Sequence, residues 1–143
     1  MSTGFDGSQP GSCCKLLAPL RADNATQAMT GLLTTHVLNT ASGTPAKSLS
    51  LALLELDTSL GKWVQRSRSV TNEDGRCRTL LGDKPLSAAT YLLRFDTGDY
   101  WKELQTESFF PYVEVVFTIT DPTQNHHVPL LLSPFSYTTY RGS

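Results

Sequence analysis

Short segments in which apolar and polar residues alternate constrain the fold of this chain more than any other feature of its sequence. A period of two places successive side chains on opposite faces of a β-strand. Gly, Pro and Asp residues separate these segments, a spacing typical of antiparallel sandwiches. The predicted strands cover residues 34–40, 48–57, 62–70, 77–82, 90–96 and 112–120, with two more within residues 127–143. We therefore predict an all-β fold, an antiparallel β-sandwich of two sheets.

One stretch departs from this pattern. Residues 99–105 are predicted to form a helix of two turns at most, and Asp99 suits its N-terminal end because a carboxylate there complements the unpaired backbone N–H groups. The sequence therefore predicts a sandwich with one short helix.

Composition limits the domain organisation and the partners. The chain has 143 residues, 39% of them hydrophobic and 17% charged, which is enough for one self-sufficient core. We interpret residues 1–30, rich in small and polar residues, as a flexible leader with a possible targeting role, and residues 31–143 as the folded domain. A net charge of −1 gives no electrostatic case for binding nucleic acid or an anionic membrane. No apolar run approaches the ~20 residues of a membrane span.

The cysteines bear on the cellular compartment. There are three, two of them adjacent, and no spacing typical of a zinc site. With no signal-peptide pattern at the start, we expect a reducing location, peroxisomal or cytoplasmic, and not a secreted protein.

Three side chains are candidates for chemistry: His36, Arg76 and His127. Taken singly, a strand histidine is more often a surface residue, and an arginine after Asp-Gly is usually solvated. Alternation, however, places both histidines on strand faces opposite the apolar positions. Two imidazoles and a guanidinium, without an evident nucleophile, suit hydrolysis by activated water.

Other chemistries have weaker support. The chain has no Gly-x-Ser-x-Gly elbow, and Cys77 has no motif around it. Adjacent strand residues point to opposite faces, so His126 and His127 do not easily share a metal ion. We therefore predict neither a metal nor a cofactor.

Several segments together resemble the hydrolase branch of the transthyretin-like family, over about residues 32–143. The final Tyr-Arg-Gly-Ser is the most specific match, because it distinguishes the hydrolases from the hormone carriers of the same fold. The sequence departs from the family pattern at His126, where an aromatic is more common, and at Asn39, where Asp is common. The matching segments are residues 35–39, 71–76, 95–101 and 127–143.

The resemblance implies a transthyretin-like fold and the hydrolysis of 5-hydroxyisourate to 2-oxo-4-hydroxy-4-carboxy-5-ureidoimidazoline, a step of urate breakdown. It also implies a homotetramer, a dimer of dimers, with active sites in a channel where dimers meet. The implied catalytic set is His36, Arg76 and His127, and which histidine acts as the base stays open. The implied substrate-binding residues are Tyr140, Arg141, Gly142 and Ser143. The alternative function is a carrier that binds a small apolar hormone in the same channel.

Overall fold

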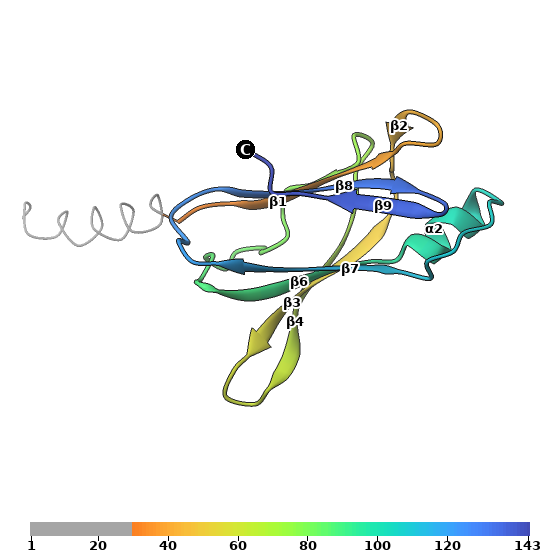
Figure 1. Ribbon diagram of the computed structural model, residues 1–143. Helices are drawn as coiled ribbons and strands as arrows, with labels where there is room; N and C mark the ends of the chain where they lie inside the picture. Colours follow the sequence, from red (N-terminus) through yellow and green to blue (C-terminus); the bar gives the residue numbers. More distant parts are fainter. Residues whose placement is uncertain (1–29) are drawn as a thin grey trace, which may run out of the picture.

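Two β-sheets packed face to face make up the described part of the protein in the computed structural model, which covers residues 30–143 (Figure 1). The predicted leader lies outside the described residues, apart from Thr30. The first sheet contains β1 (Leu33–Asn39), β2 (Thr44–Pro45), β5 (Arg76–Cys77), β8 (His126–Ser133) and β9 (Ser136–Thr139). The second contains β3 (Ser50–Asp57), β4 (Lys62–Val70), β6 (Ala89–Phe95) and β7 (Val113–Ile119). The predicted fold class is confirmed.

The core lies between the two sheets and follows the predicted alternation. In β1 the buried residues alternate with partly exposed ones along the whole strand. In β8, Val128, Leu130 and Leu132 face inward and are buried, whereas His127 is partly exposed. The outer face of the first sheet is therefore available for polar side chains.

The pairing of β1 with β8 differs from the antiparallel prediction. These two strands run parallel, whereas the other strand pairs within residues 30–143 are antiparallel. The reason is topological: the turn before β8 brings the chain across from the second sheet to the end at which β1 begins. In consequence the first and last long strands of this sheet lie side by side.

Two predicted element boundaries were wrong. The strand predicted over residues 77–82 is limited to Arg76–Cys77, because the following residues form turns in which Gly82 N bonds Thr79 O. The helix α2 (Thr97–Glu103) begins two residues earlier than predicted. It follows Asp96 directly, and Trp101 packs its buried face into the core. Asp99 nevertheless lies in its first turn, as predicted.

Candidate active site

Strand register brings the three predicted catalytic residues to one region of the first sheet. His36 in β1 is paired with Arg76 in β5, and His127 in β8 is paired with Thr34 in β1. Thr34 and His36 are two residues apart and share a face of β1, the face opposite the buried positions. All four side chains therefore belong to the outer surface of this sheet, although they come from three segments far apart in the sequence.

A tightly hydrogen-bonded loop presents Arg76. The side-chain oxygen of Asn72 accepts hydrogen bonds from the backbone N–H groups of Asp74 and Arg76. Gly75 has a φ of +72°, a conformation that favours glycine, and its carbonyl accepts a hydrogen bond from Val37 N at 2.8 Å. The loop is thus attached to β1 one residue away from His36.

His127 is held by contacts on its ring and its backbone. Its Nδ1 lies 2.8 Å from Oγ1 of Thr34, and its carbonyl accepts a hydrogen bond of 2.8 Å from the N–H of Gly142. The latter contact forms an isolated antiparallel bridge between β8 and the tail, residues 140–143. The tail is therefore tied to the strand that carries His127.

The surroundings of His127 favour its neutral form. Burial lowers the pKa of His127 below its ordinary value of 6.5, and the nearby charges of Arg76 and His36 lower it further. The hydrogen bond with Thr34 raises the pKa of His127 and so acts in the opposite direction. A neutral imidazole can accept a proton from water near pH 7, so this residue is suited to general-base chemistry.

A cavity of about 370 Å³ is lined by Arg76 and His127, whereas His36 is not among its lining residues. Figure 1 shows the chain end leaving the first sheet on its outer side, away from the second sheet. Ser143 consequently lines this cavity together with Arg76 and His127. The lining residues are Leu32, Thr34, Arg76, Asn125, His126, His127 and Ser143.

The other predicted substrate-binding residues occupy different places. Tyr140 and Arg141 line a second cavity, also of about 370 Å³, whose wall includes residues of β7 as well as His127. The Arg141 guanidinium donates to Oε1 of Gln124 at 3.4 Å. Gly142 contacts His127 through the backbone. The tail thus lies between two cavities that share His127, and its four residues do not form one wall.

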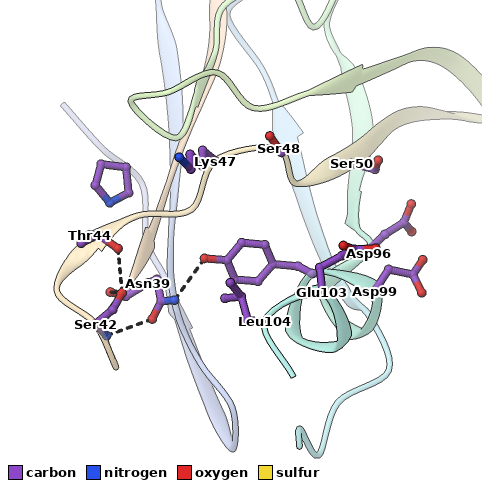
Figure 2. A pocket seen from close by; sticks show the side chains of 12 residues that line it. Asn39, Ser42, Thr44, Lys47, Ser48, Ser50, Asp96, Asp99, Glu103 and Leu104 are labelled. Carbon is purple, nitrogen blue, oxygen red and sulfur yellow. Dashed lines mark hydrogen bonds between the residues drawn. The ribbon is translucent and has the colours of Figure 1, made fainter. Parts of the chain in front are cut away.

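The largest of these cavities, about 660 Å³, contains none of the predicted site residues. Figure 2 shows it between the segment from Asn39 to Ser50 and the helix side carrying Asp99 and Glu103. There the Asn39 amide donates a 3.0 Å hydrogen bond to Oη of Tyr100, which ties β1 to α2. This contact explains why the polar Asn39 is buried.

Other kinds of site find no support in the described residues. Within residues 30–143 no group of three or more His, Cys, Asp or Glu side chains is arranged to hold a metal ion. None of the helices in this part of the chain is both long and apolar enough to cross a membrane. Cys77 is buried in the core and has a free thiol.

Sequence reasoning missed Thr34 and Asn125. Alternation placed Thr34 on the outer face of its strand, but nothing in the sequence indicated that β8 lies beside it. Asn125 lines the cavity and its side chain accepts a 2.9 Å hydrogen bond from Leu32 N, a contact that holds the start of β1 against the turn before β8. Both residues would have been identified if the parallel pairing of β1 with β8 had been predicted.

Residues 33–142 match the model of a family described as HIUase/Transthyretin. The chain belongs to the HIUase/transthyretin family. A relative from Mus musculus, named 5-hydroxyisourate hydrolase, is 60% identical over 111 residues, which cover 78% of this chain and 94% of the mouse protein.

Solved structures of both branches of the HIUase/transthyretin family resemble this chain. The Klebsiella pneumoniae 5-hydroxyisourate hydrolase has a TM-score of 0.69 and 31% identity, over 79% of this chain and 99% of that one. Sea bream transthyretin, solved in complex with thyroxine, has a TM-score of 0.72 and 33% identity, over 77% of this chain and 93% of that one. Backbone similarity therefore does not distinguish a hydrolase from a hormone carrier. The residues of the candidate site have to make that distinction.

Proposed function

We propose that this chain hydrolyses 5-hydroxyisourate, opening its six-membered ring with water to give 2-oxo-4-hydroxy-4-carboxy-5-ureidoimidazoline. The observation that carries the proposal is the convergence of His36, Arg76 and His127 on the outer face of the first sheet. The names of relatives such as the mouse protein support the same substrate.

In the reaction one imidazole accepts a proton from water while the water oxygen bonds to the ring carbonyl carbon. The carbon–nitrogen bond of the ring then breaks, and the departing nitrogen takes a proton from the other imidazole. One water is added overall, and both imidazoles return to their starting states after proton exchange with solvent. Each protein group acts either by transferring a proton or by stabilising negative charge on the substrate.

Arg76 stabilises the carbonyl oxygen as it gains negative charge. The loop fixes the backbone of Arg76 before substrate arrives, so the guanidinium is carried by a rigid base. A preorganised donor is typically worth about 3–4 kcal/mol of the barrier. Its planar fork also suits the flat substrate better than an ammonium group would.

The tail completes the substrate site in this proposal. The position of Ser143 is the strongest support for this role of the tail, because Ser143 lines the same cavity as Arg76 and His127. Tyr140 and Arg141 contact the substrate from the neighbouring cavity, which shares His127.

The test is a spectrophotometric assay with freshly prepared 5-hydroxyisourate. The full chain should accelerate the loss of substrate absorbance far above the spontaneous rate. Thyroxine binding measured on the same sample tests the carrier alternative, which has less support because the polar groups of His36, Arg76 and His127 suit an apolar ligand poorly. Tight thyroxine binding with an unchanged spontaneous rate would contradict the hydrolase assignment.

We also propose that the working form is a homotetramer, a dimer of dimers. The edge strands β4 and β7 of one sheet, and β2 and β9 of the other, have no partner on their outer side within residues 30–143. The outer face of the first sheet carries the candidate site and is open in a single chain. Unpaired strand edges are a common route to pairing between copies. Light scattering coupled to gel filtration measures the assembly directly.

For location we propose the peroxisome or the cytoplasm. Residues 1–30 are the segment to test, because they precede the family match. Fluorescent fusions of the full chain and of a chain starting at residue 31 should differ in distribution if these residues direct targeting, and identical distributions would remove that role from them.

A further inference from the structure

The imidazole of His127 is constrained along two of its edges. On one edge, Nδ1 lies 2.8 Å from the hydroxyl oxygen of Thr34. On another, Cδ2 faces Gly142 so closely that a Cβ added to this glycine would lie only 2.6 Å from it. Real Cβ atoms essentially never come so near another heavy atom. Nε2 belongs to neither of these two contacts, and the ring lines the cavity that also contains Arg76 and Ser143.

We propose that Thr34 and Gly142 are positioning residues for His127. The Thr34 hydroxyl keeps the proton on Nδ1, so that Nε2 is the atom that accepts the proton from water, and Gly142 leaves room for the ring beside the tail. This inference rests on the proposed hydrolysis and deepens it by assigning the roles of the two histidines. His127 becomes the general base, and His36 donates the proton to the departing ring nitrogen.

The choice of tautomer follows from the hydrogen-bonding capacity of a hydroxyl. A threonine oxygen can accept a hydrogen bond from Nδ1–H when the ring is neutral and also after the ring has taken a second proton on Nε2. The opposite arrangement, in which the hydroxyl donates to Nδ1, fits only a neutral ring whose proton is on Nε2. Only the first arrangement leaves Nε2 basic and survives the proton transfer.

The groups around the ring support this assignment. Arg76 from β5 and His36 from β1 both disfavour a charged His127. His126 precedes it on β8, and Arg141 lies in the tail but is directed to Gln124. Before substrate arrives, the ring is therefore held neutral by its surroundings and oriented by Thr34.

Gly142 acts by the absence of a side chain. Its N–H bonds the His127 carbonyl, so the tail backbone passes directly beside the imidazole. Any larger residue would push the ring or the tail aside. This is a different role from the substrate contact that the family resemblance implies for Gly142.

The main test compares Thr34→Val, which removes the hydroxyl with little change of volume, with Thr34→Ser, which keeps it. For Thr34→Val we expect kcat to fall about 10- to 100-fold with KM nearly unchanged, the range known for lost partners of metal-bound imidazoles. Thr34→Ser should keep a kcat close to that of the parent, because its hydroxyl can make the same hydrogen bond. Nitrogen-15 NMR of labelled histidine should show the Nδ1–H tautomer of His127 in the parent and a mixture in Thr34→Val.

A matched control lies one residue away on the same strand. Thr35 points to the other face, where its hydroxyl donates to the Val128 carbonyl at 2.6 Å. Thr35→Val removes the same group without touching His127, so it should lower stability but leave the tautomer and kcat unchanged. Gly142→Ala should lower kcat at least about as much as Thr34→Val while the melting temperature shows that the sandwich is folded.

Unchanged kcat and an unchanged tautomer in Thr34→Val would overturn the role of Thr34, and full activity in Gly142→Ala would overturn that of Gly142. A parent protein that does not hydrolyse 5-hydroxyisourate would instead reject the proposed function, and the NMR comparison would still decide whether Thr34 sets the tautomer. Should Thr34→Val not fold, Thr34→Ala read by the same NMR signal gives the answer.

Discussion

Arg76 illustrates how a single side chain can be placed by its neighbours. Its backbone N–H donates a hydrogen bond to the Asn72 side chain, and the carbonyl of the preceding Gly75 accepts one from Val37 of β1. The backbone from which the guanidinium extends is therefore fixed in position. The side chain itself is only partly buried and stays accessible to a ligand. Position and accessibility together are what an oxyanion-binding group requires.

Arg76→Ala should therefore lower kcat by at least ~10²-fold, because the negative charge on the carbonyl oxygen would lose its preorganised donor. Steady-state kinetics with 5-hydroxyisourate measure the effect. Arg78→Ala is a suitable control, since it makes the same charge change at an exposed residue that lines a different cavity. Equal rates for Arg76→Ala and the parent would exclude this role.

His127 should make stability depend on pH. Its pKa in the folded protein lies below the ordinary value of 6.5, so the folded state binds fewer protons than the unfolded state. The stability it contributes is complete above about pH 6.5 and is lost as pH falls through the lower, folded-state pKa. Urea unfolding across this range should give a steeper loss for the parent than for His127→Gln. Parallel curves for the two proteins would contradict the prediction.

At the scale of elements, the loop over residues 72–76 depends on close packing against β1. Gly75 has φ of +72°, and a Cβ there would lie 2.3 Å from the Val37 carbonyl oxygen. Gly43 has nearly the same φ, +71°, but nothing lies within 4 Å of the corresponding Cβ. A side chain at either position would have an unfavourable φ, but only a side chain at Gly75 would also clash with β1. Comparing the two positions therefore distinguishes the effect of the clash from the effect of the backbone conformation.

Gly75→Ala should lower the free energy of unfolding by about 2–3 kcal/mol and also reduce activity, because the loop must shift and Arg76 with it. Gly43→Ala should cost only about 1 kcal/mol and leave kcat unchanged. Denaturant titration of both variants gives the comparison. Similar losses at the two positions would mean that the contact with β1 is unimportant.

The tail, residues 140–143, should matter more for activity than for folding. Its residues are largely exposed, and its backbone tie to the sheet is the bridge between His127 and Gly142. A chain ending at Thr139 should therefore keep a melting temperature close to that of the parent and lose its hydrolase activity. Retained turnover in the shortened protein would refute the substrate-binding role of the tail.

How far the sequence predicts this arrangement depends on the kind of information. Period-two alternation correctly placed His36 and His127 outside the core, and the Asp-Gly pair correctly marked the loop that ends at Arg76. Alternation carries no information on which strands are neighbours, so the β1–β8 pair and the contact between Thr34 and His127 were not predicted. The separation of Tyr140 from Ser143 into two cavities depends on the path of the tail, which is irregular and has no sequence period.

At the scale of the whole molecule, exposed aromatic side chains bear on the proposed tetramer. Phe109 is 71% exposed beside the corner between β8 and β9, where its N–H bonds the Pro134 carbonyl. Its ring packs edge-to-face on Phe110, which in turn contacts Tyr137 of β9. Three aromatic rings at a sheet edge suit contact with another copy of the chain.

Phe109→Glu should therefore weaken the proposed tetramer and shift its mass toward smaller species, since a charge would have to be buried at the contact. Light scattering at several protein concentrations measures the shift. Leu60→Glu is the control, because Leu60 is similarly exposed, at 65%, in the turn between β3 and β4. An unchanged mass for Phe109→Glu would place the contact elsewhere on the molecule.

The parallel pairing of β1 with β8 has a consequence for how the protein is made. Thr34 and His127, whose side chains meet, are separated by 93 positions in the chain. During synthesis β1 emerges 93 positions before the residues of β8 that pair with it, so it lacks its main neighbour until β8 has left the exit tunnel. Such long-range pairing slows folding, and it leaves an aggregation-prone strand exposed until its partner is available. Nascent chains of this protein should therefore be clients of ribosome-associated chaperones, and a nascent chain that lacks β8 should be inactive.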